Sequence, residues 1–327
     1  MEAEKRQITL TYEVDSYRSG WTIVRMLAHR FKYHTAEGWE RRVRDGWVTV
    51  NGAVVAPEHC VRKGDEVRYT ILHAEPAVDD AYQVLFEDEW LLAVSKSGNI
   101  PVHACGVYIT HTLIARLTTD FGRKLNLAHR LDRETSGVVV LCKDVESNRR
   151  MARMFAEGQV EKSYLVVVYG EVAEDRFEID APIGKMDQRD EFPKEYAQGK
   201  LRNMATYLPK RRVDFENGKP AKTCFEVLRR GGGFTALRAV PVTGRTNQVR
   251  VHLAHVGHPV VGDKTFALSG DLRDEILREG LTERVRAALV LDRHALHCER
   301  IHFDHPMTGE DTIIAAAIPP DMAGFFA

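Results

Sequence analysis

The stretch that decides the fold of this chain is residues 128–142, Ala-His-Arg-Leu-Asp-Arg-Glu-Thr-Ser-Gly-Val-Val-Val-Leu-Cys. The apolar run after Ser-Gly predicts a buried strand, since β-branched residues bounded by a turn signal favour this structure. The charged residues ahead of the run are therefore expected on a loop at the mouth of that strand. This arrangement places one carboxylate, Asp132, at the edge of a core.

Asp132 lies two residues after Arg130 and directly before Arg133. A guanidinium close to a carboxylate favours its ionised form, and an ionised, positioned aspartate can act as a nucleophile or a general base. The same pattern is also typical of an aspartate that caps a turn or pairs with Arg130 or Arg133. Taken alone, the stretch favours this structural role.

The composition is that of an ordinary globular protein, with 327 residues of which 44% are hydrophobic, and this length allows more than one domain. No apolar run reaches the length of a bilayer span, and residues 1–6 lack the apolar stretch of a secretory signal. We therefore expect a cytoplasmic protein with no membrane partner. The five cysteines are scattered, odd in number and without Cys-x-x-Cys, which argues against a disulfide framework and a zinc ribbon.

Basic residues gather in two segments although the formal net charge is -1. Residues 18–44 hold seven Arg and Lys against two Glu, and residues 200–250 hold twelve against three acidic residues. Such segments are typical of faces that bind a polyanion. They are equally typical of solvated faces that acidic segments such as 171–180 neutralise in space.

The first 75 residues predict a small α+β module. A helix is expected within 19–31 behind a Ser19 cap, and a second from Thr35 to a stop at Gly46. An Asn-Gly turn at 51–52 predicts a hairpin over 47–55, followed by a strand over 66–72. We expect residues 76–82 to form a linker and residues 83–327 a second domain.

The second domain alternates predicted strands and helices. Strands are expected at 83–86, 91–94, 161–170, 222–229, 234–240, 296–303 and 312–318, and helices at 110–121, 145–157 and after the turn at 243–244. Residues 184–203 are polar and low in periodicity, and predict an exposed loop. Histidines recur at helical spacing in 252–258 and again in 294–305, but a metal is not indicated, because no His-Glu-x-x-His or nearby cysteine pattern accompanies them.

Four blocks, in order, resemble the RluA family of RNA pseudouridine synthases, which isomerise uridine to pseudouridine within an RNA chain. They are His-Arg-Leu-Asp at 129–132 with Thr-Ser-Gly at 135–137, Glu-Lys-Ser-Tyr at 161–164, the run from Gly-Arg-Thr at 244–246 to Gly-Asp at 262–263, and Arg-His-Ala-Leu-His at 293–297 with His-Pro-Met-Thr-Gly-Glu at 305–310. The resemblance covers about residues 82–320 and implies an α+β catalytic domain on a mixed, largely antiparallel sheet.

The resemblance implies roles for particular residues. Asp132 matches the catalytic aspartate, Tyr164 the tyrosine that packs on the target uracil, and Arg245 the basic residue that pairs with the aspartate. Arg130 matches the arginine that wedges into the stack when the uridine is flipped out, and His129 stands beside it as an RNA-binding residue. The reaction is a redox-neutral isomerisation, so the family implies neither a metal nor a small-molecule cofactor.

Residues 16–72 resemble the small RNA-binding module first seen in ribosomal protein S-four, through Arg-Asp-Gly-Trp-Val-Thr-Val-Asn-Gly at 44–52 and Arg-Lys-Gly-Asp-Glu-Val at 62–67. This resemblance implies that Arg41, Arg42 and Arg44 of the second helix, with Arg25 of the first, meet RNA phosphates. Such contacts give salt-dependent affinity without sequence readout.

Three positions depart from the family's common wording. Asn247 stands where histidine is frequent, residues 262–267 lack a usual Tyr-Gly, and residues 95–99 replace a more usual Asn-Lys-Pro. We expect that none of them touches the proposed catalytic three, Asp132, Tyr164 and Arg245. We therefore expect these departures to affect the rim of the pocket and the choice of RNA.

The sequence thus predicts a monomeric enzyme that isomerises uridines in structured ribosomal or transfer RNA. One alternative is a catalytically inert RNA-binding or ribosome-assembly protein with the same fold. Another is a carboxylate-based glycosidase acting on nucleosides, which needs a second positioned carboxylate. Glu134 is the nearby candidate for that carboxylate, and we expect it to pair with a basic neighbour instead.

Overall fold

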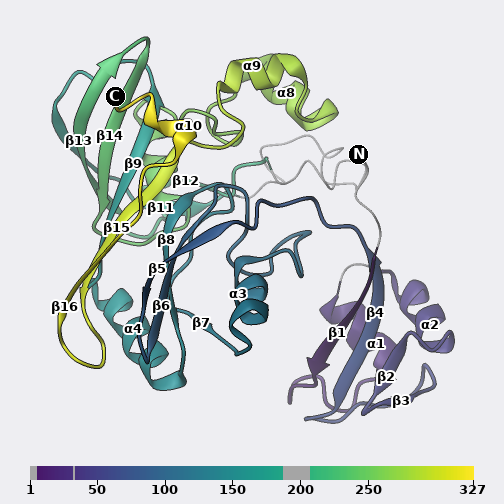
Figure 1. Ribbon diagram of the computed structural model, residues 1–327. Coiled ribbons are helices and arrows are strands. Elements are labelled where there is room, and N and C mark those ends of the chain that lie inside the picture. Colours follow the sequence, from purple (N-terminus) through teal and green to yellow (C-terminus); the bar gives the residue numbers. More distant parts are fainter. Residues whose placement is uncertain (1–5, 32–33, 187–206) are drawn as a thin grey trace. The chain divides into compact units, whose positions relative to one another are not determined.

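A computed structural model of the protein describes residues 6–31, 34–186 and 207–327. The chain divides into two compact units, residues 1–77 and 78–327 (Figure 1). Most of the loop predicted at 184–203 lies outside the described residues, and Gly184 and Lys185 end a short strand. No helix in the described ranges is long and apolar enough to cross a bilayer.

The amino-terminal unit is a four-stranded antiparallel sheet with two helices. Its elements are β1 (Arg6–Glu13), α1 (Ile23–Arg30), α2 (Ala36–Arg44), β2 (Val48–Val50), β3 (Ala53–Val54) and β4 (Glu66–His73). The strand order is β1-β4-β2-β3. The predicted hairpin is confirmed, and Asn51 and Gly52 take the positive φ angles that its tight turn requires.

Two details of this unit differ from the sequence prediction. The cap of α1 is Thr22, whose hydroxyl accepts a hydrogen bond from the backbone N–H of Arg25 at 3.3 Å, so the prediction of Ser19 as the cap is wrong. Strand β1 was not predicted because its sequence, Arg-Gln-Ile-Thr-Leu-Thr-Tyr-Glu, is largely exposed and polar. It forms by pairing along the whole of β4.

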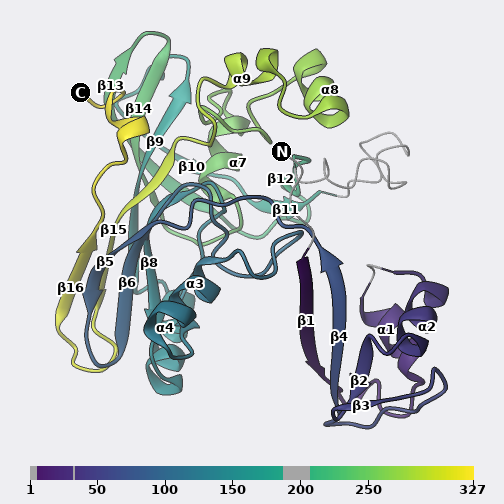
Figure 2. The same ribbon diagram turned by 45° about the vertical axis from the view of Figure 1, so that its right-hand side comes forward.

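Helices α1 and α2 lie beside the sheet of this unit (Figure 2), and each buries one apolar stripe. Ile23, Met26 and Leu27 of α1 and Trp39 and Val43 of α2 are all fully buried. They pack over apolar residues of β2 and β4. These strand residues are buried at every second position, because alternate side chains of a strand point to the same face of the sheet. The arginines of α2 lie outside this stripe.

The second unit is built on one large sheet. Its strands are β5 (Tyr82–Glu87), β6 (Leu91–Lys96), β7 (Asn126–Leu127), β8 (Ser136–Cys142), β9 (Glu161–Tyr169), β10 (Arg176–Asp180), β13 (Lys222–Gly231), β14 (Phe234–Pro241), β15 (Leu296–Asp304) and β16 (Asp311–Ala315). The main order is β10-β13-β14-β9-β15-β8-β6-β5. The β15–β8 pair is parallel and the other pairs are antiparallel, so the predicted mixed, largely antiparallel sheet is confirmed.

Helices cover this sheet and create two apolar cores. Helices α3 (Leu113–Phe121) and α4 (Val145–Glu157) pack on β6 and β8, and α7 (Gln248–His255) lies against β13 and β14 (Figure 2). All seven residues of β8 are buried, as the run after Ser-Gly predicted. The remaining elements are β11 (Ile183–Lys185), β12 (Arg211–Val213), α8 (Gly270–Glu279), α9 (Glu283–Leu289) and α10 (Pro320–Ala323).

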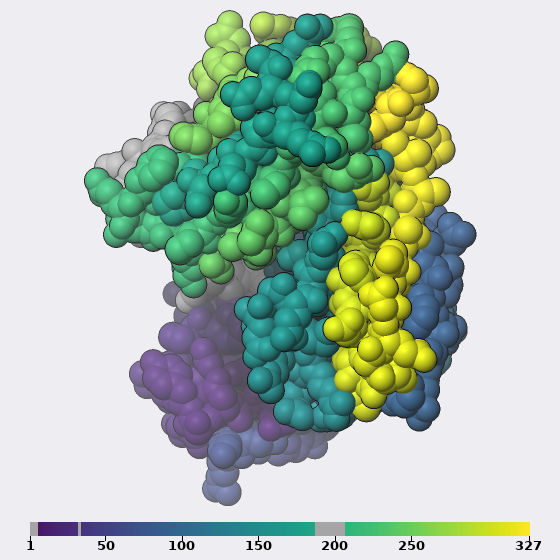
Figure 3. Space-filling model, turned by 90° about the vertical axis from the view of Figure 1, so that its left-hand side faces the viewer, coloured from purple at the N-terminus to yellow at the C-terminus, as the bar shows by residue number. Residues whose placement is uncertain are grey.

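The parallel pairing of β8 with β15 fixes the position of Ser136 and Gly137, the first two residues of β8. Gly137 lies opposite Cys298 with a φ of 106°, and a Cβ on it would stand 2.1 Å from the Cys298 carbonyl oxygen. Only glycine fits this approach. The other end of β15 forms a hairpin with β16, seen in yellow beside β5 in Figure 3. The loop before β8 is thereby held at the centre of the sheet.

Candidate active site

The loop of residues 128–135 is tied to the strands on both of its sides. The His129 ring accepts a hydrogen bond from the Val140 backbone N–H at 3.0 Å, and its face stacks on Phe155. Thr135 contacts His294 through Oγ1 and Nε2 at 2.7 Å. These contacts fix the loop at both ends, so Asp132 between them is held on a rigid frame.

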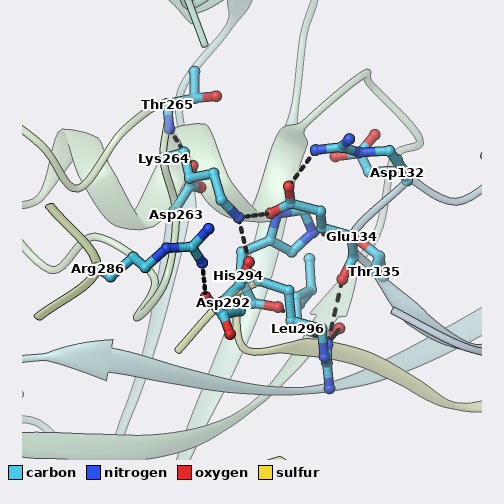
Figure 4. Close-up of polar contacts among 12 residues, drawn as sticks. Asp132, Glu134, Thr135, Asp263, Lys264, Thr265, Arg286, Asp292, His294 and Leu296 are labelled. Atoms are coloured by element: carbon cyan, nitrogen blue, oxygen red, sulfur yellow. Dashed lines mark hydrogen bonds and ion pairs between the residues drawn. The ribbon is translucent and has the colours of Figure 1, made fainter. Parts of the chain in front are cut away.

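Arg133 and Glu134 belong to a second set of contacts behind the loop. Glu134 accepts from Arg133 at 2.5 Å and from the Lys264 ammonium at 2.9 Å, and Lys264 also bonds the Asp292 carbonyl (Figure 4). Arg133 Nη1 donates to the Tyr108 hydroxyl at 2.6 Å. The expectation that Glu134 pairs with basic neighbours is therefore confirmed.

Asp132 is not paired with either arginine next to it in the sequence. Arg133 is bonded to Glu134, and Arg130 Nη1 contacts His103 Nε2 at 3.3 Å. The partners of Asp132 come instead from the start of α7. Arg250 Nη1 donates to Asp132 Oδ2 at 2.8 Å, and Asn247 Nδ2 donates to the same oxygen at 2.6 Å. Within the described residues Oδ1 has no hydrogen-bond partner.

The prediction that Arg245 pairs with the aspartate is wrong, because Arg250 makes this contact. Arg245 precedes the first turn of α7 and is exposed, and its Nε donates to the Pro220 carbonyl at 2.9 Å. Arg250 lies inside the helix and turns toward the loop of Asp132. The sequence gives one indication of this role, because Arg250 is a charged residue between Val249 and Val251. In the structure Gln248–Leu253 are all buried.

Arg250 joins two carboxylates. Its Nε and Nη2 donate to the two oxygens of Asp263 at 2.6 and 2.7 Å, while Nη1 reaches Asp132. Burial by itself lowers the pKa of Arg250, but Asp263 and Asp132 outweigh burial and the net shift is upward, so the guanidinium stays charged. Bidentate pairing of this kind fixes geometry as well as charge. Asp263 therefore orients the arginine that orients Asp132.

Asn247 is also part of the Asp132 contact, which contradicts our expectation that the departures from the family wording leave the catalytic three untouched. Its backbone has a φ of 59°, in the left-handed region, and its side chain makes no capping bond to α7. Gln248 fixes the turn before the helix, since its Oε1 accepts from the Arg245 backbone N–H at 2.9 Å. The Asn247 amide is thus directed to Asp132.

Tyr164 reaches the site from β9. Burial raises the pKa of its phenol well above the usual value, and the neighbouring Cys298 and Asp132 raise it further. The hydroxyl is therefore protonated at neutral pH. Its ring lines the site together with Leu296, and the pair adds apolar surface to a lining that is otherwise rich in charged and polar side chains.

A cavity of about 330 Å³ brings these residues together. It is lined by Asp132, Tyr164 and Arg245, by Arg130 and His129, and by Asn247 and Arg250. Burial lowers the pKa of His129 to about 3, with Lys162 adding to the shift, so its ring is neutral. His129 therefore brings no charge to the cavity, whereas the guanidinium of Arg130 is exposed at the rim.

The other predicted RNA-binding residues, Arg25, Arg41, Arg42 and Arg44, belong to the amino-terminal unit. Arg25 lies over the Trp21 ring at 4.1 Å, Arg44 pairs with Glu40, and Arg42 donates to the Thr70 carbonyl at 3.2 Å. These contacts use only part of each guanidinium. Their role in binding RNA stays a prediction.

The recurring histidines make structural hydrogen bonds. His252 contacts Thr223 at 2.9 Å, His258 contacts the Tyr169 carbonyl at 3.0 Å, and His297 contacts Ser136 at 2.9 Å. Among the described residues, no group of three or more His, Cys, Asp or Glu is placed to hold a metal ion.

Comparisons with known proteins show which family this chain is similar to. Residues 91–255 match the family described as RNA pseudouridylate synthase. The chain is 32% identical over 298 residues to ribosomal large subunit pseudouridine synthase C of Pasteurella multocida (strain Pm70), covering 86% of this chain and 82% of that protein. It is 30% identical over 314 residues to uncharacterized RNA pseudouridine synthase YlyB of Bacillus subtilis (strain 168), covering 90% and 91%. Human RNA pseudouridylate synthase domain containing 1 shares the fold, with a TM-score of 0.54, 24% identity and coverage of 76% of this chain and 89% of that one.

Proposed function

Since this chain belongs to the RNA pseudouridylate synthase family and is an RNA-modifying enzyme of that class, we propose that it converts specific uridines of structured RNA to pseudouridine with Asp132 as its catalytic carboxylate. The observation that carries the proposal is the state of this side chain. One oxygen of Asp132 is held by Arg250 and Asn247, the other is unpartnered within the described residues, and Asp132 and Tyr164 line the same cavity.

The names of the relatives favour ribosomal over transfer RNA as the substrate. Ribosomal large subunit pseudouridine synthase D of Pseudomonas aeruginosa is 28% identical over 94% of this chain, and the Pasteurella relative is likewise named for the large ribosomal subunit. We propose large-subunit ribosomal RNA as the substrate of this chain, and hence action in the cytoplasm.

The proposed chemistry uses Oδ1 of Asp132 as nucleophile or base. The bond from N1 of uracil to C1′ of the ribose breaks, the base turns, and a new bond joins C5 to C1′. C5 loses a proton and N1, once freed from the ribose, gains one, so the reaction is redox-neutral and calls for no cofactor. A rigid carboxylate contributes because it reaches the reacting atom without further ordering.

The neutral phenol of Tyr164 supports a stacking role. Its raised pKa means that the resting side chain holds its proton, and it would have to lose this proton before accepting one from C5. The ring can meanwhile cover one face of a flipped uracil. Arg130, exposed at the rim of the cavity, is suited to fill the gap that the flipped nucleotide leaves in the RNA stack.

We propose that the amino-terminal unit adds affinity for RNA, as its resemblance to the module of ribosomal protein S-four implies. The exposed arginines of α2 would contact phosphates. A double substitution of Arg41 and Arg44 by Gln is expected to weaken RNA binding and to reduce its salt dependence, with the turnover of bound RNA unchanged. Unaltered affinity in a titration would refute this role.

The two alternatives are weaker. Family membership argues against an inert protein, and Glu134 is engaged by Arg133 and Lys264 rather than placed as a second reacting carboxylate of a glycosidase. The deciding experiment is tritium release from RNA labelled at uracil C5, comparing the intact protein with Asp132→Asn. We expect release and pseudouridine from the intact protein alone. Activity that survives the substitution, or free uracil as product, would overturn the proposal.

A further inference from the structure

A second cavity adjoins the candidate active site. The short sheet of β11 and β12 lies next to α7 (Figure 2), and the space beside it, about 710 Å³, is lined by Lys185, Arg211, Arg212, Lys219 and Arg245. We call this space the basic groove. Its other charged lining residue is Asp214. The groove thus concentrates positive charge within a chain whose net charge is close to zero.

The strand register places two of these cations face to face. Lys185 and Arg211 are directly paired across β11 and β12, and both line the groove. Like charges at such a position are destabilising, because their side chains lie on the same face about 5 Å apart at Cβ. A bound anion would remove this repulsion.

No described carboxylate forms an ion pair with Lys185, Arg211 or Lys219. Other arginines of the same unit are paired, for example Arg176 with Glu226 and Arg238 with Glu299. Asp214 stabilises a turn, since its Oδ1 accepts the backbone N–H groups of Glu216 and Asn217 at 3.1 and 2.9 Å. Within the described residues, Lys185, Arg211 and Lys219 thus bring positive charge to the basic groove without a carboxylate partner.

Arg245 connects the groove to the catalytic cavity. Gly244, Arg245 and Thr246 line both spaces. The Nε of Arg245 is held by the Pro220 carbonyl, and its two Nη atoms have no hydrogen-bond partner among the described residues. A nucleotide in the catalytic cavity would have its neighbouring phosphate within reach of this guanidinium, which can bind phosphate through two parallel bonds.

An exposed aromatic ring stands on the turn that borders the groove. Phe215 is 72% exposed and follows Asp214, a lining residue, directly in the chain. A ring at the edge of a basic channel is the usual arrangement for single-stranded nucleic acid, because bases stack on the ring while the cations follow the backbone.

We infer that the basic groove binds the phosphodiester backbone of the RNA strand beside the target nucleotide, with Phe215 stacking on one base of that strand. This inference rests on the proposed function for the identity of the target. It also gives a role to Arg245, which does not pair with Asp132.

The test is the salt dependence of RNA binding by the full chain. The probe is a fluorescein-labelled dodecamer of uridylate, titrated by fluorescence anisotropy between about 50 and 200 mM salt. The groove variant carries Lys185→Gln and Lys219→Gln. The matched control carries Lys124→Gln and Arg229→Gln, two exposed cations that line neither cavity and whose loss changes the net charge equally.

Each lost phosphate contact lowers the slope of log K against log[salt] by about 0.7 for single strands. The groove variant is therefore expected to lose about 1.4 in slope and roughly 25-fold in affinity at 0.1 M salt, and the control neither. Phe215→Ala is expected to weaken binding about 10-fold without changing the slope, since base stacking is not ionic. Equal slopes for the groove variant and the control would overturn the inference.

Two further measurements separate the possible explanations. Poly-L-glutamate, an anion without bases, is titrated as a competitor of the labelled RNA, and its affinity should be the same for the intact protein and for Phe215→Ala. If Phe215→Ala weakened the binding of poly-L-glutamate as much as it weakens the binding of RNA, the result would point to a protein partner and refute the RNA assignment. Tritium release tests the proposed function independently. Release that depends on Asp132 with unchanged slopes rejects the groove alone, whereas changed slopes without pseudouridine reject the proposed function alone.

Discussion

The hydrogen bond from Asn247 to Asp132 can be removed without disturbing the backbone. Asn247 has a φ of 59°, which glycine adopts freely, so Asn247→Gly deletes the amide and keeps the conformation. The bond is 2.6 Å long and ends on a carboxylate. Hydrogen bonds to charged groups contribute about 1.5–3 kcal/mol. If this energy holds Asp132 in its reactive position, turnover should fall by about 10- to 100-fold.

Three companion variants isolate the cause. Asn247→Ala also removes the amide but adds left-handed strain of about 1–2 kcal/mol, so it should match the glycine variant in kcat and melt a few degrees lower. Asn247→Asp keeps the shape and sets a second carboxylate against Asp132, which should reduce turnover further. Asn247→His can still donate an N–H and tolerates this backbone, and it should retain most of the activity.

The assay is single-turnover tritium release from RNA labelled at uracil C5, with thermal melting of each variant. A glycine variant with the kcat of the intact protein would refute the reasoning. A glycine variant whose activity falls only as its melting temperature falls would assign Asn247 to stability alone. Recovery by Asn247→His, with the melting temperature unchanged, is the outcome that a positioning role requires.

Three other predictions concern stability. Arg250→Gln leaves Asp263 and Asp132 without their shared cation and should lower the free energy of unfolding by about 3–5 kcal/mol in urea titrations. Arg245→Gln, at an exposed site, should change this free energy by less than about 0.5 kcal/mol. Equal losses of stability in the two variants would contradict the pairing of Asp132 with Arg250. Gly137→Ala places a Cβ 2.1 Å from the Cys298 carbonyl and should leave little soluble, cooperatively melting protein, so a normal melting curve would argue against the β8–β15 contact. The pKa of His129 is lowered to about 3, so between pH 6.5 and 3 the unfolded chain binds a proton at this ring and the folded chain does not; the contribution of the ring to stability is therefore present above pH 6.5 and is lost as the pH falls. In urea titrations across pH, the free energy of unfolding of His129→Asn should fall less steeply with decreasing pH than that of the intact protein. An equal fall would count against a neutral His129 ring in the folded chain.

Local patterns in the sequence were sufficient for much of the secondary structure. The helix predicted over 145–157 is observed as Val145–Glu157, and the strand expected at 161–170 as Glu161–Tyr169. Both carry strong periodicity, and α4 has a carboxylate cap in Asp144. Hydrogen bonds of helices and turns join residues a few positions apart, so their cause is present in the local sequence. Strand β1 lacks such a pattern and depends on β4 for its hydrogen bonds.

The sequence by itself also determined which segments form the site, because Asp132 and Tyr164 stand in motifs that resemble a known family. Only the tertiary structure decided which arginine meets Asp132. Arg245 and Arg250 are equally basic in the sequence, and both lie more than a hundred positions from the aspartate. The choice depends on where α7 begins and on Asp263, which holds Arg250 from the other side. An ion pair between distant segments is set by packing of the whole unit, and no local pattern encodes it.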